Sequence, residues 1–231
     1  MAAHPTLRLP KTGTTAALAR YGSLRVSART ASGGGERTLP VKNVVVVAGH
    51  AGSGKTEFSK QLAARTGWAL LDKDTLTRPL VETLAAKLAG DPHHRHSAEY
   101  LQHIRPLEYE ALLETMWEVL EFGADGVVVT APFVKELFDP AWIDDLAFDC
   151  EIKGASLTVV WVHCDHETLQ GRIVARGAAR DRWKLVNWSS WAAGLDEPRL
   201  RPEDVRVDNS ADSVSSLSST VDDLVMRLKR A

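Results

Sequence analysis

The feature that most constrains this chain is a glycine-rich octapeptide that directly follows a run of apolar residues. The apolar run is Val44–Ala48, and the octapeptide is Gly49-His50-Ala51-Gly52-Ser53-Gly54-Lys55-Thr56. The run is short, continuous and β-branched, as is typical of a strand buried on both faces of a parallel sheet. Residues 55–66 then repeat apolar side chains at helical spacing, and Gly67 ends the pattern. The sequence therefore predicts strand, loop and helix in immediate succession.

The octapeptide matches the pattern Gly-x4-Gly-Lys-Thr of a phosphate-binding loop. Gly49, Gly52 and Gly54 permit backbone conformations in which successive N–H groups point into one concavity, and the helix N-terminus adds its dipole. We expect Lys55 to reach the β- and γ-phosphates and the Thr56 hydroxyl to coordinate the Mg²⁺ that bridges them. All eight residues, 49–56, are thus predicted to bind ATP. The alternative, a glycine-rich turn with an exposed lysine, does not account for the flanking strand and helix.

The rest of the chain alternates strand-like and helix-like segments. The further predicted strands are residues 68–71, 126–130, 157–162 and 205–208. The helical patterns cover residues 75–88, with Thr75 as the predicted cap, and residues 106–122, 166–176 and 214–228. This alternation predicts an α/β fold, a three-layer sandwich with a five-stranded parallel sheet and a ligand crevice at the carboxyl ends of its strands.

The first forty residues differ in composition from the remainder. They hold six basic residues and one acid, are rich in Thr, Ala, Ser and Gly, and show no sustained hydrophobic period. Residues 1–40 are therefore predicted to be a disordered extension, with an organelle transit peptide as the alternative. The remainder holds 22 basic and 29 acidic residues, a balance that argues against a nucleic-acid substrate.

Two further observations bear on compartment and protein class. The two cysteines, Cys150 and Cys164, form no CxxC pair, and no run of about 18 apolar residues could span a membrane. We expect a cytoplasmic protein without membrane association. The chain lacks the Asn-Lys-x-Asp segment of regulatory GTPases, and the strand at 126–130 ends in Thr130 rather than the acid usual in transporter and motor ATPases.

Residues 43 to about 228 resemble the small-molecule P-loop kinases, which include shikimate and gluconate kinases, chloramphenicol phosphotransferase and zeta toxins. Asp72-Lys73-Asp74 resembles the Asp-x-Asp motif of the shikimate kinases, and several members of the group also lack the acid where Thr130 stands. The resemblance implies a kinase domain at residues 41–231 with an arginine-bearing lid. It implies transfer of the γ-phosphoryl group of ATP, with Mg²⁺, to a hydroxyl of a small molecule.

The resemblance also implies roles for the two acids. Asp72 resembles the carboxylate that holds magnesium through water, and Asp74 resembles the one that orients or deprotonates the acceptor hydroxyl. The reverse assignment stays open. A different interpretation is that either acid only caps the helix that follows.

Four arginines are candidates for the lid cations that neutralise charge on the transferred group. Arg172 and Arg176 lie one turn apart at the end of a helix, whereas Arg180 and Arg182 enter a loop that also contains Trp183, Trp188 and Trp191. We assign Arg176 as catalytic and Arg172 as ATP-binding; the alternative is a solvated basic stretch. The tryptophans are expected to pack the lid or to stack on a substrate ring.

The remaining candidates concern the acceptor and the nucleobase. Arg78, one turn beyond Asp74, and Arg105, beside Tyr109, are predicted to bind the acceptor, although Arg78 is equally placed for an ion pair with Asp74. Asn209, after the last strand, resembles the adenine-side loop of these kinases. The histidines at 93, 94 and 96 lack an accompanying acid or cysteine ligand set, so they are not taken as a metal site.

Other functions fit part of this pattern. They are a toxin-like kinase of nucleotide sugars, a regulatory or assembly ATPase without a metabolite acceptor, and a polynucleotide kinase, against which the acidic domain argues. The sequence leaves the oligomeric state open between monomer and homodimer.

Overall fold

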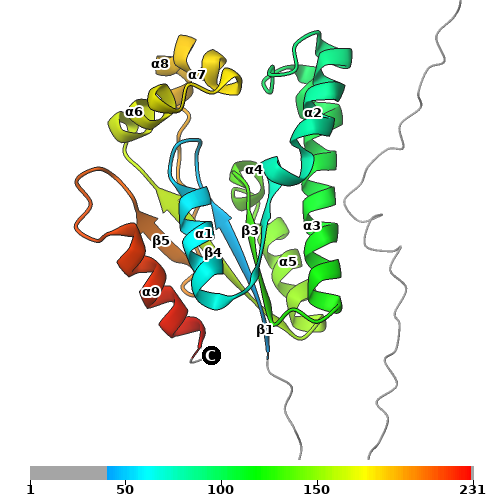
Figure 1. Ribbon diagram of the computed structural model, residues 1–231, viewed down its shortest axis with the longest axis vertical. Helices are drawn as coiled ribbons and strands as arrows, with labels where there is room; N and C mark the ends of the chain where they lie inside the picture. Colours follow the sequence, from blue (N-terminus) through cyan, green and yellow to red (C-terminus); the bar gives the residue numbers. More distant parts are fainter. Residues whose placement is uncertain (1–40, 230–231) are drawn as a thin grey trace, which may run out of the picture. The chain divides into compact units, whose positions relative to one another are not determined.

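A five-stranded parallel sheet forms the centre of the computed structural model, which describes residues 41–229 (Figure 1). The predicted extension at residues 1–40, with its transit-peptide alternative, lies outside the described residues. The strand order is β2-β3-β1-β4-β5, and every neighbouring pair is parallel. The strands are β1 (Lys42–Ala48), β2 (Ala69–Asp72), β3 (Gly126–Thr130), β4 (Ala155–His163) and β5 (Val205–Asp208).

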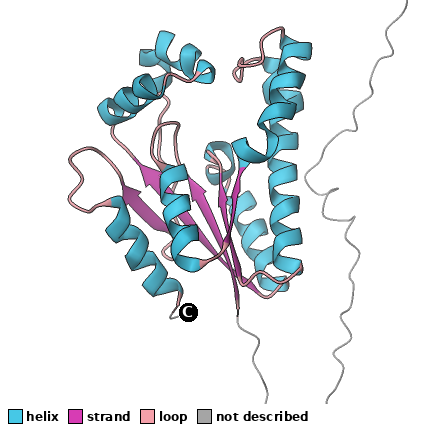
Figure 2. Ribbon diagram, in the orientation of Figure 1, coloured by secondary structure: helices cyan, strands magenta, loops and turns pink. Residues whose placement is uncertain are grey.

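Helices cover both faces of the sheet (Figure 2). The longer ones are α1 (Lys55–Thr66), α2 (Lys73–Ala89), α3 (Arg105–Glu121), α5 (Pro140–Ile152), α6 (His166–Arg176) and α9 (Leu217–Leu228). The shorter ones are the π-helix η3 (Tyr100–Ile104), α4 (Val134–Leu137), the 3-10 helix η4 (Ala179–Asp181), α7 (Arg182–Val186) and α8 (Trp188–Ala192). The predicted three-layer α/β sandwich is confirmed.

The four valines of β1 explain why the sheet has two cores. Successive side chains of a strand point to opposite faces, so Val44 and Val46 join one hydrophobic cluster while Val45 and Val47 join the other. The first cluster contains apolar residues of α3 and α5, and the second contains those of α1 and α9. All four valines are fully buried, as predicted for a strand covered on both faces.

The start of α2 differs from the prediction. Thr75 was expected to cap this helix, but Asp72 is the cap, and the helix begins two residues earlier, at Lys73. The backbone of Asp72 is extended, and its Oδ1 accepts hydrogen bonds from the amides of Asp74 and Thr75 at 2.8 and 3.2 Å. Aspartate satisfies free amides at a helix N-terminus as well as threonine does, and here it lies at the strand end where the chain turns.

Other elements were missed or placed wrongly from the sequence. Helix α5 has no counterpart in the prediction, and the tryptophans expected in a loop lie on the short helices α7 and α8. The last helix was expected to start at Val214, but Ser216 caps it, and Val214 is fully exposed. Helices α7 and α8 have five residues each and are too short to show a sustained apolar period, which is why the sequence did not reveal them.

The parallel register places the carboxyl ends of the strands together. The residue Val47, near the end of β1, is level with Thr130 of β3 and Val160 of β4, and Asp72 of β2 is level with Thr130. Figure 1 shows η4, α7 and α8, which we call the lid (residues 179–192), beyond these ends on the opposite side from α2. Among residues 41–229, no helix is both long and apolar enough to cross a membrane.

Truncation of Leu224, which is 3% exposed on α9, is expected to destabilise the fold. Leu224→Ala removes a side chain from the core between α9 and the sheet and should lower the free energy of unfolding by about 2–5 kcal/mol. The matched variant Met226→Ala, at a position 51% exposed on the same helix, should change it by about 0.5 kcal/mol or less. Urea unfolding measures both, and equal losses would contradict the docking of α9.

Candidate active site

The phosphate-binding loop connects β1 to α1, as predicted. Gly54 precedes the first residue of α1 with a φ of 96°, a backbone conformation that favours glycine. A Cβ atom at this position would lie 2.2 Å from Nδ2 of Asn209. The loop therefore requires glycine here for its backbone and for the close approach of a side chain from the far end of the sheet.

A depression of about 270 Å³ lies over this loop and is lined by half of the residues predicted to bind ATP. It is lined by Gly52, Gly54, Lys55, Thr56, Glu57, Arg172 and Arg176. Arg172 and Arg176, one turn apart on α6, both line it, as their predicted shared side requires. The depression thus brings the start of α1 together with the end of α6, which lie more than a hundred residues apart in the sequence.

Lys55 is the partly buried cation of the loop. Its Nζ donates to the carbonyl oxygen of His50 at 3.3 Å. Burial lowers the pKa of Lys55 to about 8, an effect that the charge of Arg176 reinforces and the carboxylates of Asp74 and Asp72 oppose. An anionic phosphate at this place would stabilise the protonated lysine.

His50 has a second tie through its ring. The ring nitrogen Nε2 lies 2.9 Å from the carbonyl oxygen of Asp196, in the segment between the lid and β5, and the ring edge contacts Trp161 at 5.1 Å between centroids. The side chain of His50 connects the loop to the segment that follows the lid. We therefore expect His50 to contribute to ATP binding through its backbone.

Arg172 and Asn209 meet at the carbonyl oxygen of Ser53. Nη1 of Arg172 donates to it at 3.3 Å, and Nδ2 of Asn209 donates at 2.7 Å. Arg172 comes from α6, and Asn209 follows β5, so two separate elements hold the middle of the loop. Both residues lie next to the phosphate loop, where the prediction of nucleotide binding requires them.

The two acids after β2 have different surroundings. Besides capping α2, Asp72 accepts a hydrogen bond from Oγ1 of Thr56 through Oδ2 at 3.3 Å. The carboxylate of Asp72 and the hydroxyl of Thr56 thus place two oxygen atoms side by side as possible metal ligands. They fit Mg²⁺, which is held by few protein oxygens together with phosphates and waters. Helix capping and metal binding are thus compatible for Asp72, because its two oxygens face different partners.

Asp74 faces cations from its own helix α2, from the turn before η3 and from η4 of the lid. Lys73 Nζ lies 3.2 Å, Arg95 Nη1 3.0 Å and Arg180 Nη2 3.4 Å from its carboxylate oxygens. Burial alone would raise the pKa of Asp74, but the charges of Lys73, Arg95 and Arg180 outweigh it and lower the pKa far below the usual range. Asp74 is therefore ionised at neutral pH, and Arg180 joins it to the lid.

A buried ionic cluster lies directly beneath Asp74. Lys73 and Glu108, whose side chains are 4% and 1% exposed, form an ion pair at 2.6 Å. The carboxylate of Glu108 also accepts hydrogen bonds from Tyr100 at 2.5 Å and Thr77 at 3.1 Å. The position of Asp74 thus depends on a set of buried polar contacts between α2, η3 and α3.

The lid holds its own acid, Asp181, which is almost completely buried. It pairs with Arg176 at 2.6 Å and with Lys184 at 2.8 Å. Both cations influence Lys55, and each contributes to lowering its pKa. Asp181 therefore fixes Arg176, and the structure adds Lys184 as a cation near the phosphate loop that the sequence did not single out.

The remaining predicted residues lie as follows. Arg105 pairs with Glu136 at 2.8 Å and lies over the ring of Tyr109, with its guanidinium carbon 4.2 Å from the ring centroid. Arg78 is exposed on α2, and within residues 41–229 it forms no ion pair with Asp74, so that alternative is wrong. Trp183 is half-exposed and stacks on His96 at 4.0 Å between ring centroids, so it does not belong to the core.

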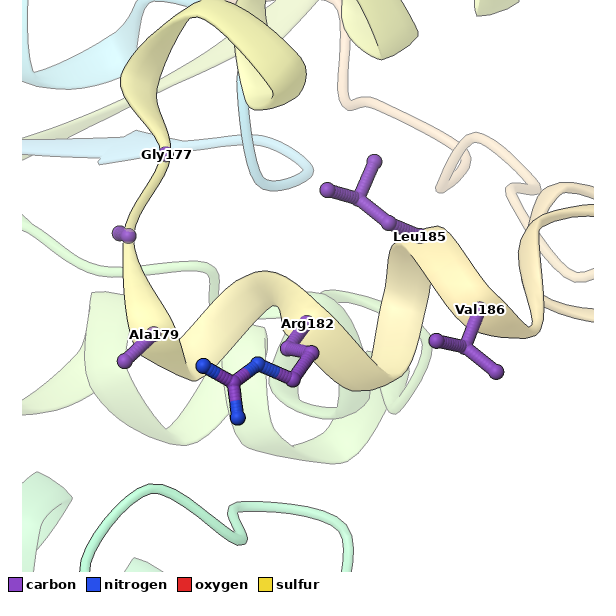
Figure 3. Close-up of a pocket in the computed structure, with 6 residues that line it drawn as sticks. Gly177, Ala179, Arg182, Leu185 and Val186 are labelled. Atoms are coloured by element: carbon purple, nitrogen blue, oxygen red, sulfur yellow. The ribbon is translucent and has the colours of Figure 1, made fainter.

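A second depression, of about 340 Å³, lies where the chain passes from α6 into the lid (Figure 3). It is lined by Gly177, Ala178, Ala179, Arg182, Leu185 and Val186. None of its lining residues belongs to the phosphate loop or to the acids after β2. The structure thus separates Arg182 from the other three predicted lid arginines, and Arg182 is the one titratable group among the described residues that line this depression.

The model of a family described as AAA domain matches residues 44–198. The chain belongs to this family. The matched region includes the phosphate loop, Asp72, Asp74 and the whole lid, but not Asn209. A search of curated proteins gives no significant match.

Solved structures share the fold at low sequence identity. A structure from Chloroflexus aurantiacus has a TM-score of 0.56 and 18% identity, over 80% of this chain and 98% of the other. A sugar kinase from Janibacter sp. gives 0.51 and 21%, over 83% and 96%. A gluconokinase from Sinorhizobium meliloti gives 0.50 and 19%, over 83% and 93%. The predicted resemblance to small-molecule P-loop kinases is thus confirmed for the fold.

The affinity for ATP is expected to fall as the pH rises above about 8. The pKa of Lys55 is about 8 in the free protein, and bound phosphate favours the protonated lysine, so above this pH binding must take up a proton. The dissociation constant of ATP should then rise up to about tenfold per pH unit. Calorimetric titration between pH 7 and 9.5 measures this slope. The variant Lys55→Met should bind ATP weakly and show no such dependence of the dissociation constant on pH. An unchanged slope in that variant would exclude Lys55 as the origin of the dependence.

Neutralisation of Glu108 is expected to destabilise the protein strongly. Glu108→Gln keeps the shape of the side chain but leaves Lys73 buried without its nearest counter-charge, which should cost about 3 kcal/mol. Glu114→Gln, at an exposed position of the same helix, is the control and should cost about 0.5 kcal/mol or less. Urea unfolding at pH 7 compares the two. A Glu108→Gln protein as stable as the control would show that the pair contributes no net stability.

Proposed function

We propose that this chain is an ATP-dependent kinase that transfers the γ-phosphoryl group to a hydroxyl of a small molecule. The observation that carries the proposal is the position of Asp74, an ionised carboxylate close enough to Lys55 to affect its pKa and joined to the lid by Arg180. A carboxylate between phosphate loop and lid is useful for orienting an acceptor, whereas hydrolysis of ATP alone requires no such group.

The residues of the loop divide the work of binding and charge neutralisation. The backbone amides of the loop and Lys55 would bind the β- and γ-phosphates. Thr56 and Asp72 would hold Mg²⁺, which supplies positive charge to the phosphate oxygens. Arg172 and Asn209 support the loop from the side where we place the nucleobase. This division gives Asp74 no role in binding phosphate or metal, and we therefore assign Asp74 to the acceptor.

Transfer requires cations over the γ-phosphate and exclusion of water. Arg176 and Lys184, both held by Asp181, would neutralise the charge that spreads over the equatorial oxygens. The acceptor oxygen forms a bond to the γ-phosphorus, and the bond between the γ-phosphorus and the bridging oxygen, which leaves with ADP, breaks. The hydroxyl proton leaves the acceptor as the new bond forms. Because its pKa is so low, Asp74 would orient the hydroxyl and accept the proton late rather than remove it beforehand.

The folds named above support a small-molecule acceptor. Two of the structures with this fold are a sugar kinase and a gluconokinase, each over more than four-fifths of this chain. The acidic balance of residues 41–231 agrees with a small metabolite rather than a nucleic acid. We expect a cytoplasmic enzyme that works as a monomer or a homodimer.

Incubation with Mg-ATP and pooled hydroxyl metabolites tests the proposal. ADP release and the mass of each metabolite are followed together. A metabolite heavier by one phosphoryl group would establish transfer and identify the acceptor. ADP that accumulates with free phosphate alone, over a pool covering sugars, sugar acids, nucleosides and nucleotide sugars, would favour a regulatory or assembly ATPase.

Replacement of Asp74 should separate transfer from nucleotide binding. Asp74→Asn keeps the size of the side chain but removes the charge that orients the hydroxyl, so kcat should fall at least about 100-fold while the Kd of ATP changes less than about threefold. Asp72→Asn should instead raise the magnesium concentration needed for half-maximal rate. Unchanged transfer by Asp74→Asn would assign the acceptor role elsewhere, and exchanged phenotypes would reverse the two assignments.

A further inference from the structure

Arg95 presents one unused hydrogen-bonding edge beside Asp74. Its Nη1 donates to Asp74 at 3.0 Å and lies 3.5 Å from Glu108. Its other two nitrogens, Nε and Nη2, are buried and have no hydrogen-bond partner among the described residues. The side chain is 12% exposed. Native proteins leave few buried donors unpaired, so this edge calls for a partner.

The unused atoms are the two donors best suited to an oxyanion. Nε and Nη2 project from the same edge of the guanidinium plane and match the two oxygens of a carboxylate or phosphate. Arg201 uses this edge on Asp204, at 3.0 and 2.9 Å, and Arg206 uses it on Glu197, at 2.8 and 2.9 Å. At Arg95 the same edge is positioned by the bond of Nη1 to Asp74 but has no carboxylate of the described chain opposite it.

The charges around Asp74 also favour an anion. Among residues 41–229, Lys73, Arg95 and Arg180 face only two carboxylates, those of Asp74 and Glu108. One positive charge therefore remains without a counter-charge in a partly buried place. A ligand with a negative group would balance it, whereas a neutral polyol would not.

The lid contacts the turn that carries Arg95. His96 follows Arg95 directly, stacks on Trp183 of α7, and has a buried Nε2 without a partner among residues 41–229. The three unpaired buried nitrogens of Arg95 and His96 thus belong to one turn, and the lid contacts this turn at His96. Movement of α7 away from His96 would admit a ligand to them, and its return would enclose the ligand.

We propose that the acceptor carries an oxyanion, either a carboxylate or a phosphate, in addition to its reactive hydroxyl, and that Arg95 binds this oxyanion through Nε and Nη2. This inference rests on the proposed kinase function. Because Nη1 of the same guanidinium holds Asp74, Arg95 fixes the distance between the oxyanion subsite and the carboxylate that orients the hydroxyl. Arg95 would thus select hydroxy acids or phosphorylated alcohols over neutral polyols.

Binding to the full-length protein tests this selection. With Mg²⁺ and a non-hydrolysable ATP analogue present, calorimetry compares gluconate with glucitol, and glycerate and glycerol 3-phosphate with glycerol. At least one anion should bind about 30-fold more tightly than its alcohol, and which one binds tells carboxylate from phosphate. Arg95→Lys keeps the charge without the paired donors and should weaken that anion about 30-fold, with the affinity for the ATP analogue changed less than threefold. Arg65→Lys, at the far end of α1, should alter neither affinity.

Three results would overturn the inference: an alcohol that binds as tightly as its anion, an anion that Arg95→Lys binds unchanged, or binding of none of the anions. If Arg95→Lys fails to fold, the comparison of anion with alcohol in the wild type decides. The kinase proposal is judged separately. If an anion binds through Arg95 but receives no phosphoryl group from ATP, the kinase proposal is wrong and the oxyanion site stands. If the protein phosphorylates neutral alcohols alone, the kinase proposal stands and the oxyanion site is wrong.

Discussion

The burial of β1 is the constraint on which the rest of the structure depends. Its alternating valines supply both hydrophobic cores at once, so the strand must lie at the centre of the sheet with helices on either face. The phosphate loop follows this strand without a spacer, and its location is thereby fixed. Strands β3 and β4 are parallel to β1 on its two sides, and their carboxyl ends bring the other site segments to the same edge.

Residues close in sequence were the ones that could be predicted. The loop from Gly49 to Thr56, the acid at the end of β2 and the shared side of Arg172 and Arg176 follow from local patterns, since a strand end or one helical turn fixes their relation. The five parallel strands also followed from hydrophobic runs. The boundaries of the elements were predicted less well. At the start of α2, for example, both Asp72 and Thr75 are residues that could cap the helix.

The remaining contacts depend on how distant segments pack. Arg95 reaches Asp74 across 21 residues, and nothing local marks it among neighbouring histidines. Lys184 gains its place through Asp181, an acid whose burial is a property of the folded lid. The residues overlooked in the sequence therefore belong to connections between strands, where no hydrophobic period reports the conformation.

The hydrogen bonds to the carbonyl oxygen of Ser53 determine when, during synthesis of the chain, the phosphate loop becomes supported. This oxygen accepts hydrogen bonds from Arg172 and from Asn209, so the middle of the phosphate loop is supported by groups that a ribosome adds more than a hundred residues later. Helix α9, which packs beside α1 in the second core, is translated later still. A nascent chain would therefore carry its whole glycine-rich motif long before that motif acquires its supports. The protein would accordingly become able to hold a nucleotide only after Asn209 has been synthesised, which couples ligand capture to completion of the sheet.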